Sequence, residues 1–383
     1  MRKYLIGLAA AAVVGATSPA VRAQESVPAL DHVFVIVLEN HNALTSFGSI
    51  GILDNPKAPH IQALANTYNF AADYNGAWHP SLPNYLAMIT GDFIGTDVIA
   101  GTPHTYAPGS TVGISDDDSP SVATDYPSPP ANTSHHRWQV RLPSLAGQLV
   151  AAGKDWRAYL QNIPASGTTL ANWPGDNNTA KIYAVKHNPF PYIEEVQNDP
   201  AQFAKQVPIE QLFSDLGAKT VPAFSYIVPD QCRDMHGLGN VLAPCGGAND
   251  TDANDVSRGD DETFWLVNGI TGSPVWTQGR NAIFVVFDEG NGPYPCTYNP
   301  DTGTDVVPGT LLPGPDCYKP ANFNDKVVMI VITNYGVRGL VDHHFYNHYS
   351  LLKTVEAAFG LPFLGHAADV TTHTLAPLLA PAN

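Results

Sequence analysis

Hydrophobic residues in this chain gather in short uninterrupted runs, each of which ends abruptly at polar residues. The clearest runs are His32–Leu38, Phe224–Val228 and Asn281–Phe287, and a fourth covers 326–333. Runs of this length that are rich in branched side chains are typical of strands buried on both faces of a parallel sheet. The pattern therefore predicts strands at these four positions.

Between the runs, apolar residues recur at helical spacing. Helices are expected at 59–68, Ser81–Thr90, 142–152 and 349–359, and a further helix is expected to start at Asp260. Pro83 fits the first turn of its helix, where proline is tolerated, and Gly153 and Gly360 follow two of the others as stop signals. This alternation of strands and helices predicts an α/β fold with a largely parallel sheet.

The composition suits one large folded unit. Of the 383 residues, 44% are hydrophobic and 14% are charged, which provides enough apolar surface for a sizeable core. Two stretches near 101–134 and 291–324 are dense in Pro, Gly, Ser, Thr or Asp and are expected to be surface excursions. With no internal repeat and no interdomain linker evident, we expect a single domain over 24–383.

Residues 1–23 have the features of an export signal. Arg2 and Lys3 form a basic start, residues 4–15 are apolar, and small residues surround Arg22 near the expected cleavage site. We expect the mature chain to begin near Gln24, to insert in no membrane once the signal is removed, and to be periplasmic or secreted. The alternative is a short N-terminal anchor.

The four cysteines fall as two close pairs, each of which brackets a loop rich in glycine or proline. In an oxidising compartment this spacing favours two local disulfides, one of three connectivities. The expected bridges are Cys232–Cys245 and Cys296–Cys317.

The charge balance limits the partners. With 19 Lys and Arg against 35 Asp and Glu, the formal net charge is −16. This value argues against non-specific binding to nucleic acid or to an anionic membrane. An anionic substrate would need a local positive charge, and a bound cation is the simplest source.

Three of the apolar runs end in acidic or amide residues. These are Glu39 with Asn40, Asp230, and Asp288 with Glu289. Any one of them could be an ordinary polar start of a loop. Because the carboxyl ends of parallel strands lie at the same edge of a sheet, we expect them to converge. Oxygen ligands from two strand ends predict a site for a hard cation or a mixed-metal site.

The candidate nucleophile lies in the Ser-Leu-Pro-Asn-Tyr sequence at 81–85. Ser81 is expected to be the N-cap of a helix, where backbone N–H groups and the positive end of the helix dipole face an incoming anion. Asn84 would add a side-chain amide one turn later. The alternative is that Ser81 only caps the helix. As a nucleophile its hydroxyl would need activation, which coordination to a metal would provide.

Together these residues resemble a known family. A strand followed by Glu39-Asn40, the sequence at 81–85, and a strand followed by Asp288-Glu289-Gly290 are similar, in this order, to the bacterial phospholipase C and acid phosphatase group of phosphoesterases. That group belongs to the alkaline phosphatase superfamily. The resemblance extends from about His32 to Leu361.

The resemblance implies a three-layer α/β/α sandwich, alkaline-phosphatase-like, with one divalent metal ion. It implies the metal ligands Glu39, Asn40, Asp288 and Glu289, with Ser81 as the fifth ligand and as the nucleophile. It also suggests that His187 and His236 line the phosphate pocket. A second metal near Asp230 and His236 is less favoured, because these residues are farther apart in sequence than in relatives with two metals. Tyr85 stands where a sulfatase would have arginine, which argues against that chemistry.

The sequence therefore predicts an exported, metal-dependent phosphoester hydrolase that acts on a small phosphorylated substrate. We favour a phosphomonoesterase with a phosphoserine intermediate. One alternative is a phospholipase C or another phosphodiesterase. An alternative of a different class is a protein that binds phosphate or phosphorylated glycans without turnover, although the nucleophile and all the metal ligands are present.

Overall fold

A computed structural model describes residues 26–46, 48–77, 81–92, 140, 142–164, 172–173, 182–237, 245, 252–290 and 325–379, together with the backbone of a few short strands between them. The expected export signal, both surface excursions apart from those strands, and the Cys296–Cys317 bridge lie outside the described residues. The Cys232–Cys245 bridge is confirmed. Among the described residues, no helix combines the length and apolar character needed to cross a bilayer.

An eight-stranded sheet forms the centre of the fold, in the order β13-β2-β12-β8-β1-β7-β5-β6. Its strands are β1 (His32–Leu38), β2 (Asn69–Ala71), β5 (Trp156–Leu160), β6 (Gln206–Pro208), β7 (Phe224–Val228), β8 (Asn281–Phe287), β12 (Met329–Thr333) and β13 (Val341–Asp342). Strands β8, β1, β7, β5 and β6 are parallel, whereas β12 runs antiparallel to both of its neighbours. The largely parallel sheet is thus confirmed.

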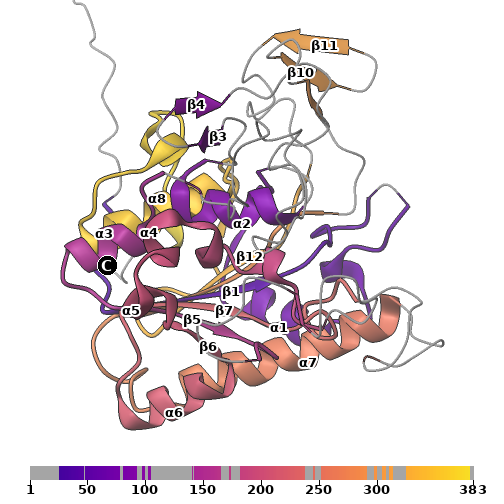
Figure 1. Ribbon diagram of the computed structural model, residues 1–383. Helices are drawn as coiled ribbons and strands as arrows, with labels where there is room; N and C mark the ends of the chain where they lie inside the picture. Colours follow the sequence, from indigo (N-terminus) through magenta and orange to yellow (C-terminus); the bar gives the residue numbers. More distant parts are fainter. Residues whose placement is uncertain are drawn as a thin grey trace, which may run out of the picture.

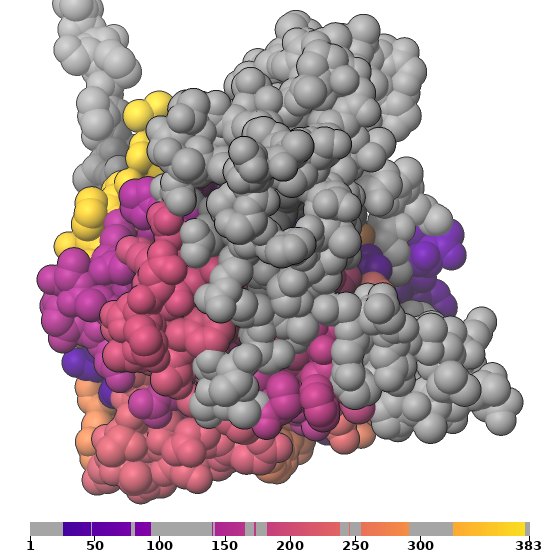
Figure 2. Space-filling model, in the orientation of Figure 1, coloured from indigo at the N-terminus to yellow at the C-terminus, as the bar shows by residue number. Residues whose placement is uncertain are grey.

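Helices cover both faces of this sheet (Figure 1). One layer contains α2 (Ser81–Thr90), α3 (Leu145–Ala151), α4 (Glu194–Gln197) and α8 (His348–Phe359), and the other contains α1 (Pro59–Thr67), α6 (Glu210–Ala218) and α7 (Asp252–Thr271). The short α5 (Pro200–Phe203) precedes β6. This arrangement is the expected α/β/α sandwich. In the same orientation, the surface along the lower edge of the molecule belongs to residues near 200–220, which include α6 (Figure 2).

The strands are buried because their side chains on both faces meet a helical layer. All seven residues of β8 are buried, as are six of the seven in β1. Burying an aliphatic side chain contributes about 1.5–3 kcal/mol, so these two strands contribute substantially to the stability of the core. Their carboxyl ends are therefore held on a rigid base.

Five short strands among those described lie outside the main sheet. Two of them, β3 (Asp97–Ile99) and β4 (Thr102–His104), form a separate antiparallel pair, and β9 (Thr297–Asn299), β10 (Thr304–Val307) and β11 (Thr310–Pro313) form a three-stranded sheet. All five fall within or beside the stretches that were expected to be surface excursions.

Two helix starts differ from the prediction. The third helix begins at Leu145 rather than 142, because Ser144 caps it by accepting a hydrogen bond from the N–H of Gly147. Helix α7 begins at Asp252, eight positions before the expected start at Asp260. In α8, by contrast, Gly360 ends the helix as expected, with a φ of 68° that favours glycine.

Candidate active site

The ends of β1 and β8 bring two acidic pairs to one edge of the sheet. The two strands are parallel neighbours, and Leu38 pairs with Phe287 in the last register position. Glu39-Asn40 and Asp288-Glu289 follow directly after these two residues, so both pairs lie at the same edge of the sheet, next to each other. The side chains of Glu39 and Asp288 are fully buried and that of Glu289 is nearly so.

The turn after β1 is shaped by a left-handed residue. Asn40 has a φ of 55°, a conformation that asparagine tolerates better than most residues. This turn directs the N–H of Asn40 to Asp288 Oδ1 at 3.0 Å, and the N–H of Glu289 donates to the same oxygen at 2.6 Å. The two strand ends are thereby joined through one carboxylate oxygen.

The other oxygen of Asp288 is the best indication of what the site binds. Asp288 Oδ2 is buried and accepts no hydrogen bond from any described residue. Burial raises the pKa of Asp288 well above its usual value, and the neighbouring charges of Glu39 and Glu289 raise it further. Buried carboxylates at this density are costly unless a cation compensates them. The donor set, which consists of oxygen atoms, fits a hard divalent cation.

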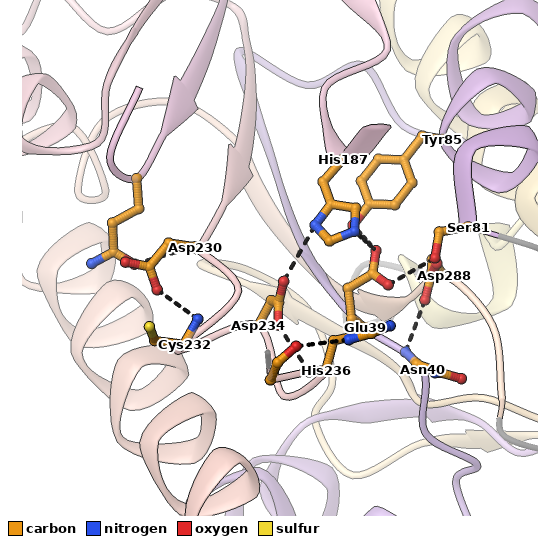
Figure 3. Close-up of polar contacts among 12 residues, drawn as sticks. Glu39, Asn40, Ser81, Tyr85, His187, Asp230, Cys232, Asp234, His236 and Asp288 are labelled. Atoms are coloured by element: carbon orange, nitrogen blue, oxygen red, sulfur yellow. Dashed lines mark hydrogen bonds and ion pairs between the residues drawn. The ribbon is translucent and has the colours of Figure 1, made fainter. Parts of the chain in front are cut away.

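Ser81 lies against these carboxylates at the start of α2 (Figure 3). Its Oγ donates to Glu39 Oε2 at 2.9 Å and lies 3.5 Å from Glu289 Oε1. The hydroxyl is almost completely buried. The structure makes Ser81 the first residue of the helix rather than the expected N-cap, a shift of one position that still leaves the first-turn N–H groups next to the hydroxyl.

Asn84 is fixed at both ends of its amide. Its Oδ1 accepts a hydrogen bond from the N–H of Ala77 at 2.7 Å, and its Nδ2 donates to Glu289 Oε2 at 3.3 Å. Asn84 therefore connects the nucleophile helix to the acidic pair after β8. The expected metal ligands, Ser81 and Asn84 are thus all found at one place.

Two residues that the sequence analysis did not assign to the site also belong to this cluster. Tyr85 donates through its hydroxyl to Glu39 Oε1 at 2.5 Å, and Asp234 Oδ2 lies 3.2 Å from His187 Nδ1. Asp234 follows the strand-end residue Asp230 by four positions, which is the only sequence signal that could have indicated it. Burial raises the pKa of Tyr85 well above its usual value, so the phenol remains a donor.

His187 occupies the space between two carboxylates. Its Nε2 lies 3.2 Å from Glu39 Oε1, its Nδ1 faces Asp234, and its ring stacks on Tyr85 with centroids 5.3 Å apart. Burial lowers the pKa of His187 well below its usual value, and it raises that of Asp234, to which the charge of Glu39 also contributes. Both ring nitrogens thus face protein groups.

His236 and Asp230 do not contact the cluster formed by Ser81, Glu39 and Asp288 in the way that His187 does. His236 is exposed, its ring is centred 6.5 Å from that of His187, and its Nδ1 lies 2.9 Å from the carbonyl oxygen of Gly237. Asp230 is buried apart from Ser81 and Glu39 (Figure 3), where it accepts hydrogen bonds from the Cys232 N–H at 3.0 Å, from Arg233 at 3.0 Å and from Asn162. These contacts direct the Asp230 carboxylate away from the Ser81 cluster, so they give no support to a second metal there.

A second group of metal-type ligands lies on the opposite helical layer. Atoms of His60, Asp260 and Asp261 all lie within 4.8 Å of one another. Asp260, however, accepts hydrogen bonds from the backbone N–H groups of His60 at 2.9 Å and Ile61 at 2.8 Å. It therefore serves as a cap for the start of α1, and this role accounts for its burial.

Comparison with known proteins identifies the class. Residues 38–362 match the sequence profile of the Phosphoesterase family. The chain belongs to this family, and it is a phosphoric ester hydrolase, as the fold and the buried acidic site had indicated.

The individual relatives share about a quarter of the aligned residues with this chain. The chain is 24% identical over 370 residues to a phosphatidylinositol-3-phosphatase of Mycobacterium tuberculosis, covering 95% of this chain and 90% of that one. It is 23% identical over 308 residues to an acid phosphatase of Aspergillus fumigatus, covering 80% of this chain and 52% of the fungal protein, or about half its length. A solved structure of an alkaline phosphatase superfamily protein from Vibrio parahaemolyticus aligns with a TM-score of 0.46 at 12% identity, over 90% of this chain and 72% of that one.

Proposed function

We propose that the chain is an exported, cation-dependent phosphomonoesterase in which Ser81 attacks phosphorus and is transiently phosphorylated. The observation that carries this proposal is the position of Ser81 Oγ, 2.9 Å from Glu39 Oε2 at the start of α2. A serine that only capped a helix would have no need of a buried carboxylate as its partner. A hydroxyl that faces acids from two strand ends fits a nucleophile.

The residues that would hold one divalent cation are Glu39, Asn40, Ser81, Asp288 and Glu289. When bound, the cation would supply the positive charge that an anionic substrate needs and would favour the ionised serine oxygen. The buried Asp288 Oδ2, which accepts no hydrogen bond from a described residue, supports this assignment. A second cation is not part of the proposal.

The chain's own groups can carry the two transfer steps. The Ser81 Oγ–P bond forms while the ester P–O bond breaks, and the hydroxyl proton is directed at Glu39 Oε2. First-turn N–H groups of α2 and the amide of Asn84 would bind phosphoryl oxygens. The leaving oxygen takes up a proton, for which the exposed imidazole of His236 is the candidate donor. In the second step water forms a bond to phosphorus and gives a proton to His236, while the Ser81 Oγ–P bond breaks. The Ser81 oxygen takes back a proton from Glu39, and phosphate is released.

His187 has a different role in this proposal from the one expected from the sequence. Its ring lies between Glu39 and Asp234 and stacks on Tyr85, so we propose that it orients Glu39 and does not contact phosphate. Its replacement would then affect turnover through the nucleophile and the cation site. Substrate affinity would change less.

The preferred substrate class is a phosphate monoester. The name of the mycobacterial relative adds a lipid-borne monoester to the candidates. The Cys232–Cys245 bridge supports an oxidising, exported location. A phosphodiesterase, including a phospholipase C, and a non-catalytic phosphate-binding protein are the alternatives that the experiment has to separate.

The test compares the wild type with Ser81→Ala and with Ser225→Ala as a matched control. Ser225 is also buried, but it lies within β7, and its hydroxyl has no hydrogen-bond partner among the described residues. Each protein is assayed on p-nitrophenyl phosphate, its diester analogue, phosphatidylcholine and phosphatidylinositol 3-phosphate, with and without chelator. Acid-quenched samples are examined by mass spectrometry for phosphate on the peptide that contains Ser81.

We expect Ser81→Ala to lose at least about 10³-fold in kcat on monoesters, as for loss of an activated nucleophile. Ser225→Ala should retain wild-type kcat. Substantial activity in Ser81→Ala with normal metal content would favour direct attack by water. Faster turnover of a diester or of phosphatidylcholine would favour the phosphodiesterase, and binding of phosphate without any turnover would favour the non-catalytic alternative.

A further inference from the structure

A buried histidine that was not among the expected site residues contacts the backbone of the turn that contains Asp288 and Glu289. His348 is the first residue of α8, and its imidazole is completely buried. Its Nε2 lies 2.5 Å from the backbone carbonyl oxygen of Asp288, and its Nδ1 lies 3.0 Å from the hydroxyl of Tyr74. Tyr74 is also completely buried. The three residues come from separate parts of the chain and meet only in the fold.

The chemistry of the partners fixes the direction of both hydrogen bonds. A carbonyl oxygen can only accept, so His348 Nε2 must carry the hydrogen that points at Asp288. In the neutral ring Nδ1 is then an acceptor, and the Tyr74 hydroxyl donates to it. The Tyr74 hydroxyl, together with the Asp288 carbonyl, thus stabilises the tautomer in which His348 donates to Asp288.

The carbonyl that His348 binds belongs to the peptide that links the two acidic residues. Because a peptide unit is planar, fixing the Asp288 carbonyl also fixes the direction of the Glu289 N–H. That N–H donates to Asp288 Oδ1 at 2.6 Å. The next N–H, that of Gly290, donates to the Asp325 carboxylate at 3.0 and 3.2 Å. The turn is therefore held at successive peptides.

Helix α8 also packs against the nucleophile helix. Tyr349, the residue after His348, forms a small apolar cluster with Ala87 of α2 and with Ala77. The same helix start therefore contacts the element that carries Ser81 and the turn that carries Asp288. The first turn of α8 is already capped by Asn347 and Ser350, so the helix has no need of an imidazole at this place.

We propose that His348 is a positioning residue, which holds the Asp288–Glu289 peptide in the orientation that directs both carboxylates to the cation site, and that Tyr74 helps to maintain its tautomer. The inference rests on the proposed function, because it assumes that these carboxylates bind a cation. His348 contacts the backbone of a ligand and acts on the reaction only through it. Outer groups of this kind are generally worth about 10–100-fold in metal affinity or activity.

The test uses Tyr74→Phe, His348→Gln and His348→Leu. Phenylalanine retains the ring of Tyr74 and removes only the hydroxyl. Glutamine can place an amide donor near the position of Nε2, whereas leucine fills space without donating. Tyr159→Phe is the matched control, since Tyr159 is a buried tyrosine that donates to Asp215 at 2.7 Å from β5.

For each protein, Mn²⁺ affinity is measured by calorimetry, the melting temperature is measured without metal, and kcat and KM are measured on p-nitrophenyl phosphate. We expect the Mn²⁺ Kd to rise about 10–100-fold in His348→Leu, about 3–10-fold in Tyr74→Phe, and less in His348→Gln than in His348→Leu. The kcat values should fall in the same order while KM changes less than about threefold. Tyr159→Phe should leave Kd and kcat unchanged.

Nitrogen NMR of the imidazole gives a readout that is independent of metal. The wild type should show the tautomer protonated at Nε2, and Tyr74→Phe should show a mixture. If wild-type protein binds Mn²⁺ and Tyr74→Phe or a folded His348→Leu binds it equally well, the positioning role is refuted while the proposed function stands. Equal losses in His348→Gln and His348→Leu would also refute it. If the wild type binds no divalent cation, both proposals fail.

Discussion

Replacing Asp288 by asparagine should stabilise the metal-free protein and weaken the metal-bound one. The substitution retains shape and the Oδ1 acceptor for the N–H groups of Asn40 and Glu289. What it removes is one negative charge from a buried cluster that also contains Glu39. In the metal-free state that charge is a cost, whereas in the proposed metal-bound state it would be part of the ligand set.

The size of the effect depends on pH, and its sign follows from the raised pKa of Asp288. A carboxyl whose folded-state pKa lies above its unfolded value contributes most stability below the unfolded pKa of about 3.8, and that contribution falls as pH rises through the folded-state pKa. Asparagine does not titrate, so the advantage of Asp288→Asn should be near zero at about pH 4 and grow toward neutral pH. Relief of one buried, partly satisfied carboxylate is worth about 1–3 kcal/mol.

The assay is thermal unfolding at pH 4 and pH 7.5, with chelator and with saturating Mn²⁺, together with Mn²⁺ calorimetry. With chelator at pH 7.5 we expect the variant to melt roughly 1–4 °C higher than wild type. The Mn²⁺ Kd should rise by at least about 10²-fold, since site affinity depends on ligand charge. The matched control is Asp215→Asn, which breaks a buried pair with Arg157 and should destabilise the protein with or without metal. If Asp288→Asn were destabilised with chelator at pH 7.5, the charge argument would be wrong.

Two further substitutions test other parts of the structure. A Cβ at Gly290 would lie 1.8 Å from Asn42 Oδ1, so Gly290→Ala should displace the turn after β8. We expect kcat on a phosphate monoester to fall by about 10²-fold. A wild-type kcat would contradict the close contact. Burial raises the pKa of Glu356 to about 8. Glu356→Gln should therefore change the free energy of unfolding little at pH 5 and increase it by up to about 5 kcal/mol at pH 9, as measured by urea unfolding. A pH-independent difference would contradict the raised pKa.

The elements that the sequence predicted best are those whose signal is local. The bounds of β1, β7, β8 and α2 agree with the prediction, because each is a continuous apolar or helical run with polar residues at its ends. The run at 326–333 was too long, because its first residues form isolated bridges with Asn42 and Asn75 outside the ladder of β12.

Other elements depend on distant partners and gave no local signal. Strand β5 contains Arg157, whose charge is acceptable in a sheet only because it pairs with Asp215 on α6. Strands β2 and β13 have three and two residues, which is too short for a periodic pattern. Such strands form because neighbouring strands offer hydrogen-bonding partners.

The same distinction applies to the site. Acidic pairs at strand ends and a serine at a helix start could be found from the sequence, because the topology of a parallel sheet determines where strand ends go. The supporting residues could not, since Asp234, Tyr74 and His348 are defined only by what they contact. Neither the tautomer of His348 nor the orientation of His187 has a counterpart in sequence spacing.

Tyr85 shows how a supporting group can be compatible with the proposed cation site. Glu39 accepts hydrogen bonds from the hydroxyls of Ser81 and Tyr85, which satisfy its oxygens and leave its negative charge in place. An arginine at position 85 would stabilise the buried carboxylate more strongly, but it would also cancel the charge that a cation needs. A tyrosine that stays protonated avoids this conflict. The hydrogen bond from Tyr85 is therefore compatible with the proposed cation site.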